Sequence, residues 1–312
     1  MPYNHTTAML QESIDLLQLM PGMTVVDCTL GGCGHARAIC SKIMPDGMLI
    51  GIDQDQDAIN NAQTLLGTLY ENIHIFHANF IRLPDLLGQL GLAGVDAIIV
   101  DLGISQNQIE RSGRGFSFKR NEPLDMRMDT RTDLTAAQII NTWGQIELEK
   151  IFREYGEERW SKSIARRIVA TRKKKKFANS LELAQLIIDT IPGKKYSRQN
   201  IHPATRVFMA LRIAVNQELK RLENFLPTAV NLLNQKGRLC VLSFHSLEDR
   251  IVKHQFKALA TTCTCPPKMP KCICGKKPQV KILTPKVKRP GKEEIKVNPM
   301  ARSTRLRALE KY

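Results

Sequence analysis

The sequence has no long hydrophobic run: nowhere in its 312 residues is there a stretch of about 18 uncharged apolar residues, the length that a transmembrane helix requires. We therefore expect no membrane association. Residues 1–20 contain no Lys or Arg and include Glu12 and Asp15, a composition unlike that of a secretory signal or a transit peptide. The expected location is cytoplasmic.

The sequence also lacks the glycine motifs that bind phosphate groups. Neither the phosphate loop G-x-x-x-x-G-K-[ST] nor the dinucleotide motif G-x-G-x-x-G occurs. Instead, Met23–His35 contains a short apolar run, an aspartate, and then three glycines within four residues. The next apolar run, Met48–Ile52, leads directly into Asp53, 18 residues after His35.

This spacing indicates the type of ligand. An acidic residue about 20 positions after a glycine-rich turn is typical of a second strand that offers a carboxylate to ribose hydroxyls. A glycine turn with such a carboxylate, but without a phosphate cradle, fits S-adenosylmethionine, which carries no phosphate. The alternative interpretation is a turn that only builds the fold.

Predicted strands and helices alternate up to residue 101, which indicates an α/β fold with a mostly parallel sheet covered on both faces. In such sheets the ligand lies outside the carboxyl ends of the strands. One turn and three single residues follow predicted strands at that edge. Phe80, one of them, either stacks on an adenine or packs into the core. The turn is Gly31–His35, and the residues are Asp53, Phe80 and Asp101. The predicted strands are the start of Met23–His35, Met48–Ile52, Ile73–His77 and Ala97–Val100, and the predicted helices are Ala8–Leu19, Ala36–Met44, Asp55–Leu69 and Leu83–Leu90.

The alternation stops after Leu102. No periodicity is visible from Leu102 to about Thr132, and a loop of this length inside a domain is usually functional. Helical patterns without strands follow, so we predict an inserted all-helical domain at 109–205, between the two parts of a Rossmann-like domain, 1–108 and 206–312. The predicted helices of the insert are Leu134–Asn141, Glu147–Tyr155, Trp160–Arg172 and Leu181–Ile191.

The second part of the Rossmann-like domain begins with two predicted helices, Thr205–Leu222 and Leu226–Asn234. A strand at Arg238–Phe244 follows, and the last predicted strand is Ser303–Ala308. Ser246, with Asp249 three residues later, matches a helix N-cap box.

The charge is strongly positive and clustered. The formal net charge is +16, from 46 basic and 30 acidic residues. Residues 159–176 carry nine Lys or Arg and no acid, and residues 276–312 carry twelve against three acids. Two basic blocks favour a nucleic-acid partner, whereas a single charge run is more often only a solvated face.

The eight cysteines fall into two groups. Without an export signal we expect them to be reduced. Four lie in the tail as two C-x-C pairs, a spacing less specific for zinc than C-x-x-C. The default is a metal-free loop, so no metal is assigned, and zinc is the alternative. These residues are Cys263, Cys265, Cys272 and Cys274.

Several motifs resemble those of the RsmH (MraW) family of bacterial methyltransferases, and the match runs from His5 to Arg307. The motifs are Asp101-Leu-Gly-Ile-Ser105, Arg114-Gly-Phe-Ser-Phe118, Pro123-Leu-Asp-Met-Arg-Met-Asp129, Tyr155-Gly-Glu-Glu-Arg159, His202-Pro-Ala-Thr-Arg206 and Ser243-Phe-His-Ser-Leu-Glu-Asp-Arg-Ile-Val-Lys253.

The resemblance implies a class I S-adenosylmethionine-dependent methyltransferase with a helical insert. Its expected substrate is the exocyclic N4 amine of a cytidine in the decoding region of 16S rRNA, in the assembled or late-assembling small ribosomal subunit. The implied cofactor-binding residues are Cys33, Gly34, His35, Asp53, Phe80, Asp101 and Gln108. Cys33 replaces the glycine usual in the family and places a side chain where backbone should approach the cofactor.

The chemistry needs positioned acceptors more than strong acids or bases. Asp101 is the candidate acceptor for the cytosine amine, although a role in orienting the cofactor competes equally. Phe116 and Phe118 are candidates for holding the unstacked base, and packing against the insert is their alternative role. The remaining candidates for substrate binding are His245, Arg250, Lys173 and Lys174.

Two other classes stay open. A DNA amino methyltransferase would usually show an [NDS]-P-P-[YFW] turn after the fourth strand, where this chain has Asp101-Leu-Gly-Ile104. A non-catalytic RNA-binding protein on the same fold would differ from an enzyme in its binding of S-adenosylmethionine.

Overall fold

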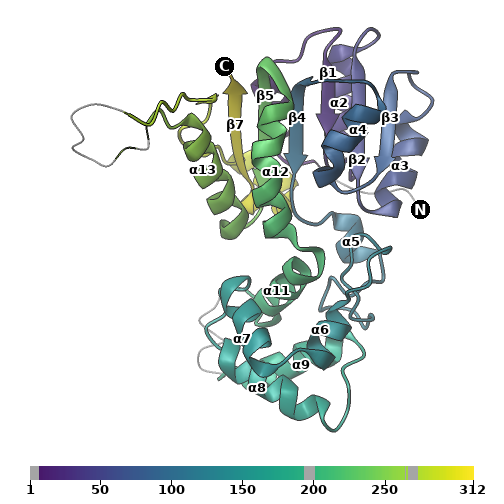
Figure 1. The fold of residues 1–312 in the computed structure, drawn as a ribbon. Helices are drawn as coiled ribbons and strands as arrows, with labels where there is room; N and C mark the ends of the chain where they lie inside the picture. The colour runs from purple at the N-terminus through teal and green to yellow at the C-terminus, as the bar shows by residue number, and fades with distance from the viewer. Residues whose placement is uncertain (1–6, 193–200, 264, 266–272) are drawn as a thin grey trace. The chain divides into compact units, whose positions relative to one another are not determined.

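The computed structural model describes residues 7–192, 201–263, 265 and 273–312, which form two compact units (Figure 1). Unit 1 comprises Met1–Gly103 and Leu219–Tyr312, and unit 2 comprises Ile104–Glu218. Within the described ranges, no helix has the length and apolar character needed to cross a bilayer.

Unit 1 is built on a seven-stranded sheet of order β3-β2-β1-β4-β5-β7-β6. Strands β1 to β5 run parallel, whereas β7 runs antiparallel to both of its neighbours. This order, with one reversed strand between β5 and β6, is the class I methyltransferase topology, so the predicted fold class is confirmed. The strands are β1 (Thr24–Asp27), β2 (Met48–Asp53), β3 (Ile73–His77), β4 (Val95–Asp101), β5 (Leu233–Ser243), β6 (Val280–Ile282) and β7 (Arg305–Lys311).

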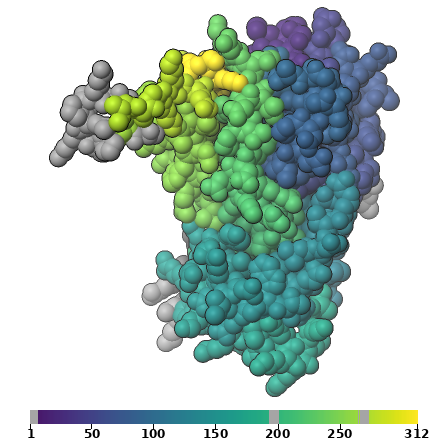
Figure 2. Space-filling model, viewed as in Figure 1, coloured from purple at the N-terminus to yellow at the C-terminus, as the bar shows by residue number. Residues whose placement is uncertain are grey.

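Both faces of the sheet are buried because successive side chains of a strand point to opposite faces. Ile98, Val100 and Val241 lie in the apolar cluster on one face, which α4, α12 and α13 cover. Ala97, Ile99 and Leu242 lie in the cluster on the other face, beneath α1, α2 and α3. Helices α4, α12 and α13 form the surface of unit 1 on the side seen in Figure 2.

Helices flank the strands of unit 1, and α1 to α4 lie at nearly the predicted positions. The helices are α1 (Leu10–Leu17), α2 (Gly34–Ile43), α3 (Gln56–Leu66), α4 (Leu83–Gln89), α12 (Glu218–Leu232), α13 (Ser246–Ala260) and α14 (Lys292–Val297), with short 3₁₀ helices at Phe80–Arg82 and Pro299–Ser303. The predicted helix Leu226–Asn234 is wrong at both ends, because α12 begins at Glu218 and β5 already begins at Leu233. Strand β6 and helix α14 were not predicted, because three to six residues are too few to show a period.

Unit 2 packs its helices around one apolar core that includes Ile140, Phe152 and Leu211. In its described part the only β pairing is an isolated bridge between Pro123 and Asn179. The helices are α5 (Gln106–Glu110), α6 (Ala136–Thr142), α7 (Gln145–Glu154), α8 (Ser161–Arg172), α9 (Ser180–Thr190) and α11 (Ala204–Asn216).

The predicted helix Thr205–Leu222 is wrong in one respect: it is two helices. Helix α11 ends at Asn216, and Gln217 follows in the left-handed region with φ 51°. Arg212 donates both Nε and Nη2 to the carboxylate of Glu218, which fixes the bend. Because Val207, Phe208 and Leu211 belong to the core of unit 2, α11 lies in unit 2, whereas the sequence placed residues from 206 onward in the Rossmann-like domain.

The predicted N-cap at Ser246 is also wrong by one residue. His245 is the N-cap of α13, and its Nδ1 accepts a hydrogen bond from the Glu248 amide. The Glu248 carboxylate accepts from the amides of Phe244 and His245. Asp249 does not cap the helix, because Arg307 of β7 donates Nε to its Oδ1 at 2.6 Å.

The aperiodic segment before α6 is held by polar side chains. Arg114 donates to the carbonyls of Arg127 and Met128, and Arg127 forms a bidentate pair with Asp125. Burial would raise the pKa of Asp125, but these bonds from Arg127 hold it below its usual value. Buried Asn216 of α11 accepts from the Met128 amide and donates to the Met126 carbonyl, both at 2.8 Å.

We expect Asn216→Ala to destabilise unit 2 by roughly 2–3 kcal/mol, since it leaves a buried N–H and a buried carbonyl without partners. Urea unfolding followed by fluorescence measures the change. Asn224→Ala on the exposed side of α12 is the matched control. A loss no larger than that of the control would show that Asn216 does not hold the segment.

Candidate active site at the carboxyl edge of the sheet

The turn after β1 is tightly constrained. Gly31 has φ 44° and Cys33 has φ 62°, both in the left-handed region. A Cβ on Gly34 would lie 1.7 Å from Thr7 Oγ1, so only glycine fits there. Cys33 then caps α2, and its amide donates to the Leu30 carbonyl. The turn stays partly exposed at Gly31, Gly32 and Gly34, and close approach of the cofactor to its backbone stays a prediction.

The Cys33 thiol does not project out of this turn. Cys33 is 0% exposed and joins the apolar cluster beneath α2. Its Sγ lies 3.6 Å from Asn61 Nδ2, and burial raises the thiol pKa to about 12. The expectation that the side chain occupies the space of approaching backbone is therefore corrected: it is turned into the core, at the cost of a left-handed backbone that glycine adopts more easily.

Asp53 ties the second strand to the glycine turn. Its Oδ2 accepts from the Gly31 amide and its Oδ1 from the Asp55 amide, both at 2.9 Å. Burial raises the pKa of Asp53 to about 6, although these bonds oppose the shift. The glycine turn and Asp53, which the sequence linked only by their spacing, are thus in direct contact in the structure.

Asp27, the last residue of β1, is a polar residue of this edge that the sequence reasoning missed. It is 1% exposed, its Oδ1 accepts from the Thr29 amide, and its Oδ2 has no hydrogen-bond partner among the described residues. Burial raises its pKa well above the usual value, and the charges of Asp101 and Asp53 add to that effect. The acid four residues before Gly31 was the available signal.

Asp101 ends β4 beside the same turn. Its amide donates to Thr29 Oγ1 at 2.7 Å, and its Oδ2 lies 3.6 Å from His35 Nδ1. Its side chain is 12% exposed, and its Oδ1 finds no hydrogen-bond partner in the part of the chain that the structure describes. Burial raises the pKa of Asp101 to about 8, and the Glu248 carboxylate contributes.

These residues form an acidic edge, which we define as Asp27, Asp53 and Asp101. They end the adjacent strands β1, β2 and β4. No Lys or Arg of the described ranges makes an ion pair with any of them. A buried group of carboxylates without a cation is costly, so the edge favours a positively charged ligand.

The other two candidates for cofactor binding have local partners. Phe80 is 8% exposed and packs against Phe225 with ring centroids 4.8 Å apart, so most of the ring belongs to the core. Gln108 lies in unit 2, where its side chain accepts from the Ser105 amide in the capping box of α5. The cofactor contacts of both residues stay predictions.

Phe116 and Phe118 meet in a pocket of about 460 Å³ in unit 2. Phe118 stacks on His202 with centroids 4.3 Å apart and meets Phe208 edge-on, while Arg114 lies 5.4 Å above the Phe116 ring. Both phenylalanines therefore pack against other residues of unit 2, which is the alternative role that the sequence left open for them. Exposed Lys119 and Arg120 add positive charge to the pocket wall.

The remaining substrate candidates lie apart in the chain. His245 caps α13 and its Nε2 lies 3.1 Å from Glu248 Oε1, and Arg250 is exposed on the same helix. Lys173 and Lys174 are exposed at the end of α8, whereas their neighbour Lys175 pairs with Glu182. Of the tail cysteines, Cys272 lies outside the described residues.

The comparisons with known proteins agree with this geometry. The model of the MraW methylase family matches residues 2–312. The chain belongs to this family. It is 53% identical over 307 residues to the ribosomal RNA small subunit methyltransferase H of Desulforapulum autotrophicum, with 98% of each chain covered. Proteins of the same name from Desulfosudis oleivorans and Trichlorobacter lovleyi are 48% and 47% identical, and each alignment covers at least 98% of both chains.

Membership confirms the prediction of a methyltransferase whose cofactor is S-adenosylmethionine. The acidic edge fits this cofactor, because a sulfonium and an amino group are cations and a ribose offers hydroxyl donors. Asp27 Oδ2 and Asp101 Oδ1 are buried acceptors that a ligand would satisfy. We expect Asp53 to hold the ribose.

We expect Asp53→Ala to weaken S-adenosylmethionine binding by roughly 1.5–3 kcal/mol, the scale of hydrogen bonds to a charged group. Calorimetric titration of the full chain measures it. Asp57→Ala removes an exposed carboxylate four residues further on and should leave the affinity unchanged. Wild-type affinity in a folded Asp53→Ala protein would refute the assignment.

A second expectation concerns stability and pH. The pKa of Asp101 rises on folding from 3.8 to about 8, so the folded protein loses stability as the pH rises through that interval. Asp101→Asn removes this loss. Without cofactor, the variant should therefore become more stable than wild type by on the order of 5 kcal/mol at pH 8, and by much less at pH 4.

Thermal melts across this pH range measure the difference. Asp57→Asn, which neutralises an exposed carboxylate of the same unit, isolates the effect of burial. If the stability advantage of Asp101→Asn did not grow with pH, Asp101 would not be the strained carboxylate of the edge.

Proposed function

We propose that the chain transfers a methyl group from S-adenosylmethionine to the exocyclic N4 amine of a cytidine in the decoding region of 16S rRNA, within the assembled or late-assembling small ribosomal subunit. The relatives that match the whole chain are named ribosomal RNA small subunit methyltransferases, which supports a small-subunit rRNA substrate. The choice of a cytosine amine rests on the resemblance of the motifs and on Asp101.

The proposal depends most on one observation, the buried acceptor oxygen of Asp101 at the end of β4. A cytosine amine is a weak nucleophile because its lone pair is delocalised into the ring. An acceptor that holds its hydrogens favours a pyramidal nitrogen and stabilises the transition state. Asp101 provides a buried oxygen, Oδ1, without a partner among the described residues. The side chain is braced through Oδ2 near His35 Nδ1.

The raised pKa of Asp101 suits a second task. When bound, S-adenosylmethionine supplies an activated methyl group on its sulfonium. The methylated nitrogen must then release a proton, and a carboxylate whose pKa is near the working pH is an effective acceptor. Because Asp101 has a pKa of about 8 in the unliganded protein, its ionised fraction rises as the pH increases through that value. A bound cation would lower the pKa and move this rise to lower pH.

The pocket of unit 2 provides a surface for the unstacked base. Phe116, Phe118 and Phe208 give it aromatic walls, which hold a base of any sequence by stacking. We expect Lys119 and Arg120, which line the pocket, to contact the phosphates beside that base. Exposed Lys173 and Lys174 extend the positive surface of unit 2, and contacts of this type position an RNA without reading its sequence.

The test is methylation of small subunits from a strain that lacks the modification, with isotope-labelled S-adenosylmethionine and analysis of the released nucleosides. We expect label in N4-methylcytidine. Label in another nucleoside would refute the target atom, and binding of S-adenosylmethionine without any transfer would favour a non-catalytic RNA-binding protein.

Variants of Asp101 test its role in the same assay. We expect Asp101→Ala to reduce kcat by about 10²–10⁴-fold, the range for loss of a positioned acid or base. Asp101→Asn keeps an acceptor oxygen but takes no proton, so it should be less impaired and should lose the rise of rate with pH. Asp57→Asn is the control. Wild-type rates for Asp101→Ala would remove Asp101 from the reaction.

A further inference from the structure

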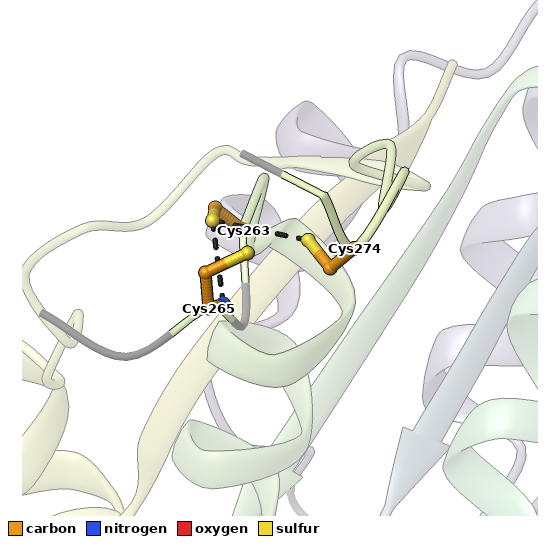
Figure 3. A group of neighbouring side chains, drawn as sticks. All are labelled: Cys263, Cys265 and Cys274. Atoms are coloured by element: carbon orange, nitrogen blue, oxygen red, sulfur yellow. Dashed lines mark hydrogen bonds between the residues drawn. The ribbon is translucent and has the colours of Figure 1, made fainter. Parts of the chain in front are cut away.

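Three cysteines converge where helix α13 leads toward strand β6 (Figure 3). Cys263 and Cys265 follow the end of α13 at Ala260, and Cys274 precedes β6, which begins at Val280. The ligand atoms of all three lie within 4.8 Å of one another. The sulfur atoms of Cys263 and Cys274 thus lie close together although the two residues are eleven positions apart in the chain.

The spacing of the sulfurs is that of a metal site. Cys263 Sγ and Cys274 Sγ are 3.8 Å apart. Two thiolates bound to one zinc at about 2.3 Å, with a tetrahedral angle between them, are separated by about 3.8 Å. A disulfide would require about 2.05 Å, so the pair is not placed for a covalent bond.

Backbone amides support the sulfurs. The Cys265 amide donates to Cys263 Sγ, and the Ile273 amide donates to Cys265 Sγ, each at 3.4 Å. Donors of this kind stabilise the negative charge of thiolates and orient them toward a metal. Two of the three sulfurs therefore receive the outer contacts that metal ligands commonly have.

The other described cysteines have a different environment. Cys28, Cys33, Cys40 and Cys240 are buried, and burial raises the pKa of each thiol. They are held as neutral, apolar side chains. Cys263 and Cys274 are exposed and Cys265 is half-buried, so a metal ion from solvent can reach them.

We propose that Cys263, Cys265 and Cys274 bind a zinc ion as thiolates. An all-sulfur ligand set selects soft or borderline metals over magnesium or calcium. Cys272, the fourth residue of the two C-x-C pairs, lies outside the described residues and the argument does not depend on it. The site is independent of the acidic edge and of the methyl transfer.

The metal would link the chain just after α13, at Cys263 and Cys265, to the chain that leads into β6, at Cys274. Just beyond the cysteines, the Gln279 amide donates to the Leu259 carbonyl at 2.9 Å, and Val280 is buried under α13. β6 has only three residues and forms the edge of the sheet. Closing the chain that precedes it stabilises this edge by reducing the entropy of the unfolded segment.

The experiment is metal analysis of the full-length chain, purified under reducing conditions without chelator, by inductively coupled plasma mass spectrometry. We expect about one zinc per chain. The triple variant Cys263→Ser, Cys265→Ser, Cys274→Ser should carry less than about a tenth of that, because serine is a poor zinc ligand. Cys40→Ala, which removes a buried cysteine of α2, should keep the metal.

Cobalt substitution provides a readout that does not depend on the variants. The apo-protein with added Co²⁺ should show thiolate-to-cobalt charge transfer in the near ultraviolet and the intense visible bands of a tetrahedral site, and zinc should abolish both. Three results would overturn the proposal: wild-type protein without zinc that also gives no cobalt spectrum, equal zinc in the triple variant, or a disulfide among these cysteines in protein kept reduced.

Discussion

Asp27, Asp53 and Asp101 end three adjacent parallel strands, so their carboxylates are buried at the same edge of the sheet. Burial raises the pKa of each, and no Lys or Arg of the described residues makes an ion pair with them. Such an arrangement persists only because the strands continue into a sheet with apolar clusters on both faces. The stability of that core offsets the cost of the edge, and the strained edge in turn selects a cationic ligand.

Only some residues of the acidic edge could be predicted from the sequence. Asp53 was found because the distance between a glycine turn and a second strand is fixed by one helix, which makes spacing informative. Asp27 was missed because the sequence shows the acid, whereas the lack of a partner for its Oδ2 is a property of the packed sheet. Cys33 shows a similar limit: the sequence reveals a side chain in the turn, but only the fold shows that φ 62° directs the thiol into the core.

In unit 2 and at the N-cap of α13, prediction from the sequence failed for another reason. The segment before α6 has no period because its order comes from hydrogen bonds of Arg114, Arg127 and Asn216 to backbone groups 13, 5 and 88 positions away. Local rules cannot predict partners that are 88 residues apart, as Asn216 and Met128 are. At α13 the sequence indicated Ser246 as the N-cap, but His245 has that role, and Asp249, which would complete a box with Ser246, binds Arg307 of the last strand instead.

This last contact connects the end of the chain to the acidic edge. Strand β7 lies between β5 and β6, so the sheet is complete only when residues near the C-terminus have been added. Arg307 contacts Asp249 in the first turn of α13, next to the capping box that His245 and Glu248 form. The neighbouring residue, Glu248, is 2% exposed and raises the pKa of Asp101. Burial is the larger cause of that shift, and Glu248 adds to it from the same helix turn that Arg307 of β7 contacts.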